Sequence, residues 1–157
     1  MAITVGQSAP DFTLHENPAT QHSLSDYRGK NVVIAFFPGA FTGVCTTEMC
    51  AFRDRIDDFN GLNAVVLGIT VDPPFAQAAW KAANNVEYTF LSDYNREVVN
   101  AYDVALPGLA GMQGYVAAKR AVTIVDGEGV VRYHWVSESP ANEPNYDEVR
   151  AAVAALS

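Results

Sequence analysis

The two cysteines of the sequence, five residues apart, are its most reactive side chains. Cys45 and Cys50 lie at the end of segment 36–50, which joins a continuous apolar stretch to a helical pattern. Cys45 would thus lie in the first turn of a helix. Unpaired backbone N–H groups and the positive end of the helix dipole stabilise a thiolate there, and the thiolate is the nucleophilic form of cysteine. Position alone leaves open whether Cys45 is reactive or is a small buried hydrophobic residue.

The elements that position Cys45 follow an alternating pattern. Apolar stretches bounded by turn residues predict strands, and helical spacing of apolar residues predicts helices. The alternation implies parallel strands with right-handed crossovers, and the turn Asp126-Gly-Glu-Gly adds an antiparallel hairpin. Segments 15–30 and 105–118 are expected to be loops. The expected strands are 11–14, 31–37, 64–71, 88–91, 120–126 and 130–136, and the expected helices are 42–59, 75–83, 95–102 and 146–156.

We therefore predict an α/β fold with a mixed central sheet flanked by helices. The 157 residues suit one domain, expected over 1–157. Hydrophobic residues make up 49% of the chain and charged residues 18%, which argues against disorder. The net charge of −8 disfavours binding to nucleic acids and to anionic membranes. The sequence has neither a membrane-spanning apolar stretch nor a secretory signal pattern, so the cytoplasm is the expected location.

Three further residues, Pro38, Thr42 and Arg120, narrow the chemistry that the cysteine segment indicates. Pro38, Thr42 and Cys45 form the pattern P-x-x-x-T-x-x-C between the expected strand and helix, and Arg120 opens a later strand. This pattern closely resembles the active-site loop of the peroxiredoxins. The resemblance extends over nearly the whole chain, from Gly6-Gln-Ser-Ala-Pro-Asp-Phe-Thr-Leu through Leu91-Ser-Asp to Lys119-Arg-Ala-Val-Thr-Ile-Val-Asp. It implies a thioredoxin-like fold and a thiol peroxidase activity without a cofactor.

The resemblance also implies a role for each site residue. Cys45 would attack a peroxide as a thiolate and become a sulfenic acid. Thr42 would hydrogen-bond the thiolate and the peroxide, and Arg120 would place positive charge beside the sulfur. Pro38 would shield the pocket, and the backbone N–H groups of Val44 and Cys45 would donate to the peroxide oxygens.

Several of these roles have simpler alternatives. Thr42 or Thr46 could be only a helix cap, and Arg120 could pair with a surface carboxylate. Glu48, one helical turn after Cys45, either orients an arginine or complements the helix dipole. The sequence leaves these alternatives open.

Cys50 bears on the step that follows the attack on peroxide, in which the sulfenic acid at Cys45 is removed. Its spacing matches the Q, or bacterioferritin-comigratory, type of peroxiredoxin, in which such a cysteine resolves the sulfenic acid. Much of the remaining chain resembles the E type, which often uses one cysteine. In a regular helix, residues five apart point about 140° apart and their Cα atoms are separated by about 8 Å or more. A disulfide needs about 7 Å or less, so resolution by Cys50 requires the helix to unwind. The alternative is a structural Cys50 and an external thiol.

Other functions fit the sequence less well. The three histidines are scattered, and no C-x-x-C or H-E-x-x-H pattern occurs, so no metal site is predicted. The missing C-x-x-C also disfavours a general disulfide reductase. The main competing function is a redox-sensing or interaction protein on the same fold. For the peroxidase, the expected partners are a peroxide, thioredoxin or a similar thiol reductant, and a second copy of the chain in a homodimer.

Overall fold

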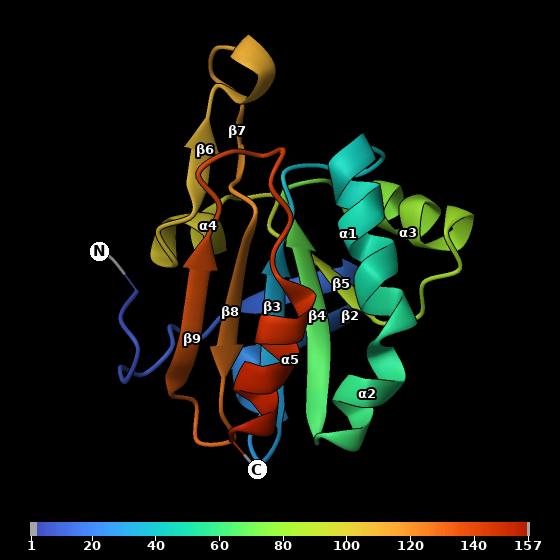
Figure 1. Cartoon of the computed structure of the whole chain (residues 1–157). Helices are drawn as coiled ribbons and strands as arrows, with labels where there is room; N and C mark the ends of the chain where they lie inside the picture. Colours follow the sequence, from blue (N-terminus) through green and yellow to red (C-terminus); the bar gives the residue numbers. More distant parts are fainter. Residues whose placement is uncertain (1–2, 157) are drawn as a thin grey trace.

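The computed structural model describes residues 3–156 and has a seven-stranded mixed sheet at its centre (Figure 1). The strand order is β2-β1-β5-β4-β3-β8-β9. Strands β3, β4 and β5 are parallel, whereas β8 and β9 run antiparallel at one edge. The strands are β1 (Thr13–Asn17), β2 (Thr20–Ser23), β3 (Asn31–Phe36), β4 (Ala64–Thr70), β5 (Thr89–Ser92), β8 (Ala121–Val125) and β9 (Val131–Val136). The predicted mixed central sheet is thereby confirmed.

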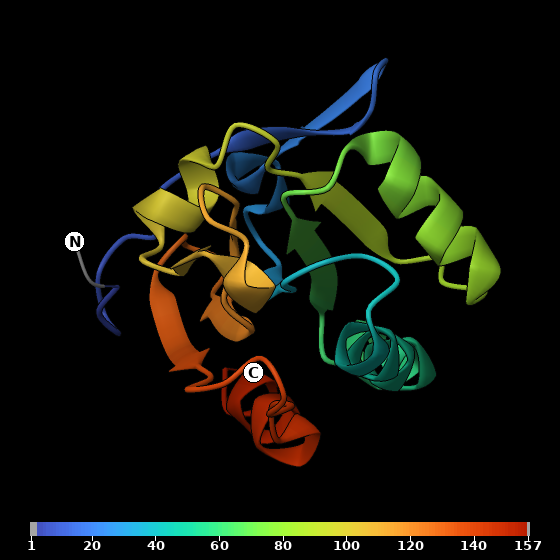
Figure 2. The ribbon, with the colours of Figure 1, turned by 90° about the horizontal axis from the view of Figure 1, so that it is seen from above.

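Helices cover both faces of this sheet. Seen from above, α1 and α5 lie on one side of the strands and α4 lies on the other (Figure 2). One buried cluster joins side chains of α1, α2, α3 and α5 to the first face, and a second joins α4 and the N-terminal segment to the opposite face. The helices are α1 (Gly43–Asp54), α2 (Ile56–Gly61), α3 (Pro74–Ala83), α4 (Glu97–Ala101) and α5 (Tyr146–Ala154), with a short 3₁₀ turn η1 (Leu24–Tyr27).

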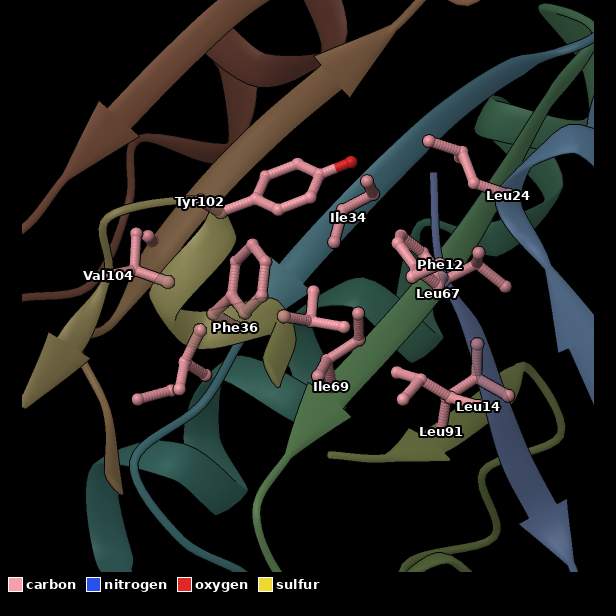
Figure 3. Packing of buried hydrophobic residues seen from close by; sticks show 14 of the residues in the cluster. Phe12, Leu14, Leu24, Ile34, Phe36, Leu67, Ile69, Leu91, Tyr102 and Val104 are labelled. Atoms are coloured by element: carbon pink, nitrogen blue, oxygen red, sulfur yellow. The ribbon is translucent and has the colours of Figure 1, made fainter. Parts of the chain in front are cut away.

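The two central strands are buried on both faces, as their continuous apolar sequences predict. In β3, Ile34 and Phe36 face the cluster that contains Leu67, Ile69 and Tyr102 (Figure 3). Val33 and Ala35 face the opposite cluster. At Gly68 of β4, a side chain would meet the ring of Phe90 at 2.5 Å, so only glycine lets that aromatic ring lie against the strand.

Strand register brings the ends of two distant segments together. Strand β8 pairs antiparallel with β3, and Ala121 lies opposite Phe36. The residue that precedes β8 therefore lies beside the residue that follows β3. Because the Cys45 loop leaves the end of β3, this register places Arg120 next to it.

Two segments expected to be loops contain strands. Segment 15–30 holds most of the β1–β2 hairpin and the turn η1, which polar surface residues obscured. Segment 105–118 forms a separate two-stranded hairpin, β6 (Ala105–Pro107) and β7 (Val116–Ala118), around the 3₁₀ turn η2 (Leu109–Gly111). This hairpin projects from the body of the molecule (Figure 1). Its strands have three residues each, too few for a periodic signal.

The helix expected over 42–59 is two helices. It is interrupted at Arg55, which ends α1 and precedes α2. Asp93 precedes α4, and its carboxylate accepts hydrogen bonds from the N–H groups of Val98 and Val99 in the first turn of that helix. In the part of the chain that the structure describes, no helix is long and apolar enough to cross a membrane.

Candidate active site

Cys45 is the third residue of α1, in the first turn as predicted, and its side chain is fully buried. Thr46 is the first residue of the helix whose N–H finds a partner, the carbonyl oxygen of Thr42. The N–H groups of Gly43, Val44 and Cys45 precede it, and a helix leaves these positions unpaired. The sulfur therefore lies where backbone dipoles favour negative charge.

The loop before α1 is held by contacts to the next strand–helix connection. The Ala40 N–H donates to a carboxylate oxygen of Asp72 at 2.8 Å. Phe41 has a φ of 62°, in the left-handed region that non-glycine residues seldom adopt. Pro38 is buried in this loop. The loop is thus a fixed, locally strained connection to the start of the helix.

Arg120 brings positive charge directly to the sulfur. Its Nη2 lies 3.3 Å from Cys45 Sγ, and its side chain is almost completely buried. Its Nε and Nη2 also donate to the carbonyl oxygen of Pro140 at 3.0 and 2.8 Å. A planar guanidinium with several donors can hold all of these partners at once.

Glu48 lies on the other side of the guanidinium. Its Oε1 accepts from Arg120 Nη1 at 2.7 Å, and both side chains are buried. Burial raises the pKa of Glu48 from an ordinary value of 4.5 to about 8, and the hydrogen bond and charge of Arg120 offset only part of this rise. Within residues 3–156, its Oε2 is buried without a hydrogen-bond partner.

The pKa of Arg120 itself is raised. Burial alone would lower it, but the neighbouring Cys45 and Glu48 outweigh that effect. The guanidinium is therefore protonated at neutral pH. The sequence left open whether Glu48 orients an arginine or complements the helix dipole. In the structure Glu48 is a partner of Arg120.

The raised pKa of Glu48 predicts a pH dependence of stability. Between pH 4.5 and 8 the folded state binds a proton that the unfolded state has lost, so the free energy of unfolding should fall as pH rises. In Glu48→Gln, this part of the fall should disappear. Urea unfolding at several pH values compares the two proteins, and Glu87→Gln, on the surface, is the control. Equal pH slopes for wild type and Glu48→Gln would contradict the prediction.

Thr42 does not cap α1, and Cys50 lies apart from the Cys45 sulfur. Thr42 precedes α1, but its hydroxyl donates to the Gly39 carbonyl at 2.8 Å and does not cap the helix. Cys50 is a free, half-buried thiol whose Sγ lies 3.8 Å from Asn84 Oδ1 on the neighbouring segment. The structure therefore brings Cys45, Arg120 and Glu48 together and leaves Cys50 outside this group.

Comparisons with known proteins identify the family of the chain. The model of the AhpC/TSA family matches residues 5–134, which include the Cys45 loop and Arg120. The chain belongs to this family. It is a peroxiredoxin, and thus a thiol-dependent peroxidase with a thioredoxin fold, as the sequence resemblance implied.

Individual peroxiredoxins are similar along most of the chain. Peroxiredoxin Bcp of Bacillus subtilis is 33% identical, with 86% of each chain covered. The mitochondrial thioredoxin-dependent peroxide reductase of Drosophila melanogaster is 34% identical over 99% of this chain and 68% of its own. The crystal structure of peroxidoxin BcpB from Mycobacterium tuberculosis superposes with a TM-score of 0.85 at 29% identity, covering 99% of both chains.

Sequence reasoning did not find the Pro140 carbonyl that fixes Arg120. A main-chain oxygen in a loop carries no side-chain signal, and this one lies 20 residues along the chain from Arg120. The antiparallel pairing of β8 with β9 brings the following loop back to the arginine, and Ser137 N–H bonds to the Arg120 carbonyl at 2.8 Å. This peroxiredoxin thus completes its site with a main-chain group.

Proposed function

We propose that this peroxiredoxin reduces hydrogen peroxide and organic hydroperoxides through a Cys45 thiolate. The observation that carries this proposal is the 3.3 Å contact between the Arg120 guanidinium and the Cys45 sulfur at the start of α1. A buried cation and free helix N–H groups both favour the anionic sulfur. Consumption of hydrogen peroxide in the presence of reduced thioredoxin tests the activity, and a redox sensor would consume about one equivalent and stop.

In the first step the thiolate attacks one peroxide oxygen. The S–O bond forms as the O–O bond breaks, the attacked oxygen keeps its hydrogen, and the departing oxygen takes a proton from water and leaves as water or alcohol. Cys45 is oxidised to a sulfenic acid and the peroxide is reduced. Because negative charge develops on the departing oxygen, fixed donors near it lower the barrier. Arg120 and the N–H groups of Val44 and Cys45 are the proposed donors.

Thr42 and Pro38 have supporting roles in this proposal. The Thr42 hydroxyl donates its hydrogen to the Gly39 carbonyl, so its oxygen is free to accept a hydrogen bond from an incoming hydroperoxide. Pro38 shields the buried sulfur from bulk water. A pocket of about 270 Å³ opens beside Arg120. Leu106, Val136 and Pro140 in its lining suit the carbon chain of an organic hydroperoxide, and the polar side chains of Lys119, Ser137 and Glu138 also line it.

The second step is proposed to use Cys50. Its sulfur attacks the sulfenic sulfur of Cys45, the S–S bond forms as the S–O bond breaks, and water leaves. Thioredoxin or a similar thiol then reduces the disulfide, as the name of the Drosophila thioredoxin-dependent peroxide reductase suggests. Since Cys45 and Cys50 share α1, the first part of that helix must unwind for the sulfurs to meet.

The variant Cys50→Ser should separate the two steps. We expect its first reaction with peroxide to keep the wild-type rate, because Cys50 does not contact Arg120 or the Cys45 sulfur. After one equivalent of peroxide, wild type should lose the mass of two hydrogens, whereas Cys50→Ser should gain one oxygen. Intact-mass analysis measures both. A wild type that gains only oxygen, or only a mixed disulfide, would show that Cys50 is not the resolving residue.

The surface near the active site carries exposed apolar side chains. Phe41, beside the active site, and Met112, on the β6–β7 hairpin, are exposed, which supports a homodimer formed through these loops. We propose one domain over 1–157, without a cofactor and acting in the cytoplasm. The net charge of −8 supports a function that does not involve nucleic acids or anionic membranes.

A further inference from the structure

The two ends of the Cys45–Cys50 segment are held to the rest of the protein unequally. At the Cys50 end, the Tyr88 hydroxyl donates to the Met49 carbonyl at 2.9 Å, and Arg53 Nη1 donates to the Asn84 carbonyl at 2.6 Å. Cys50 itself contacts the Asn84 side chain. This end of the segment is therefore fixed to α3 and to the chain that follows it.

The Cys45 end has a single hydrogen bond of this kind. Trp80 Nε1 donates to Thr46 Oγ1 at 3.0 Å. Apart from the contact between Arg120 and the Cys45 sulfur, no other hydrogen bond ties 43–47 to another element within residues 3–156. Once the thiolate has become a sulfenic acid, the negative charge that paired with Arg120 is lost. The Thr46–Trp80 bond then remains as the polar tie of residues 43–47, while Glu48, one residue further on, keeps its bond to Arg120.

Trp80 cannot follow Thr46 if the turn moves. Its side chain is fully buried, with edge-to-face contacts to Phe37 and Phe90 at centroid distances of 5.7 and 5.4 Å. Phe90 is in turn held against Gly68 of β4. The indole N–H therefore has a fixed direction, and moving Thr46 leaves a buried donor without its partner, which is costly.

We propose that the Thr46 hydroxyl and the Trp80 indole N–H form a latch that sets how fast Cys45 reaches Cys50. This inference depends on the proposed resolving role of Cys50. With the latch closed, the first turn of α1 keeps Cys45 beside Arg120 for reaction with peroxide. When it opens, the turn unwinds and Cys45 moves toward Cys50, whose end of the helix stays anchored by Tyr88. Thr46 and Trp80 are positioning residues, since neither contacts the reacting atoms.

The test compares Thr46→Val with Thr47→Val in single-turnover reactions. Valine removes the hydroxyl and keeps the side-chain shape. Thr47 is exposed on the same turn and bonds only to Gly43 within the helix, so it is a matched control. We expect Thr46→Val to form the disulfide about fivefold faster than wild type, the shift that one hydrogen bond represents, with the peroxide step unchanged. Thr46→Ser, which keeps the hydroxyl, should restore the wild-type rate.

A second readout is the fraction of Cys45 that gains a second oxygen in excess peroxide. Faster opening removes the sulfenic acid sooner, so this fraction should fall in Thr46→Val. If wild type forms the disulfide and Thr46→Val and Thr47→Val form it at the same rate, the latch is wrong and the role of Cys50 stands. If wild type forms no disulfide, both inferences are wrong. A rate that rises in Thr46→Ser as much as in Thr46→Val also overturns the latch.

Discussion

Cys45→Ser is expected to lower peroxide turnover by about 10⁴-fold or more, because it removes the nucleophile on which both steps depend. A serine hydroxyl is not ionised at neutral pH, and the Arg120 guanidinium would have no anion to stabilise at this position. The measurement is peroxide consumption with reduced thioredoxin. Cys45 is buried in the core cluster with Met49 and Phe52, and serine is close to it in size, so the fold should persist.

The control for this experiment is Cys50→Ser, which makes the same chemical change five residues along. That variant should keep the first, stoichiometric reaction with peroxide. Thermal unfolding of both variants checks that a loss of activity is not a loss of structure. A Cys45→Ser protein that turns over peroxide at more than a small fraction of the wild-type rate would rule out the proposed mechanism.

The second large effect is expected at Arg120. Arg120→Met should slow the first step by about 10²- to 10³-fold, the loss typical for one preorganised donor to a developing charge. Arg120→Lys should fall between this variant and wild type. A lysine keeps the charge, but it lacks the fork that reaches Cys45, Glu48 and the Pro140 carbonyl together. The rate of sulfenic acid formation under single-turnover conditions measures this step alone.

Removing Arg120 also removes the partner of the buried Glu48. The raised pKa of Glu48 lets this side chain accept a proton, and the double variant Arg120→Met/Glu48→Gln avoids an unpaired charge altogether. Arg132→Met, at a surface pair with Asp126, is the matched control and should keep the wild-type rate. If the double variant folds and reacts with peroxide as fast as wild type, Arg120 has no role in the first step.

The site could be predicted from the sequence because its main signals are local. Pro38, Thr42 and Cys45 lie on one strand–loop–helix connection, and that connection is readable from a buried strand followed by helical spacing. Arg120 is distant in sequence, but it opens a strand whose partner is β3, and the sheet register places it beside the loop. The resemblance to the peroxiredoxins supplied the chemical roles.

The features that the sequence did not reveal are formed by tertiary contacts, and these contacts leave no recognisable pattern of side chains in the sequence. The Pro140 carbonyl becomes a partner of Arg120 only through the loop after β9. The interruption at Arg55 keeps apolar spacing on both sides, so the two helices read as one. The β6 and β7 strands are stabilised by pairing with each other and not by alternation of buried residues. The different anchoring of Thr46 and Met49 likewise becomes visible only when α3 and the segment that follows it lie against α1.

The most direct measurement is the identification of the cysteine that peroxide oxidises first. Treating Cys50→Ser with one equivalent of hydrogen peroxide in the presence of dimedone, a reagent that traps sulfenic acids, should label one residue. Peptide mapping by mass spectrometry should find the adduct on Cys45, and the Cys45→Ser protein treated in the same way should carry none on Cys50. An adduct on Cys50 in Cys45→Ser at a comparable rate, or an unlabelled Cys45 in Cys50→Ser, would contradict the central claim.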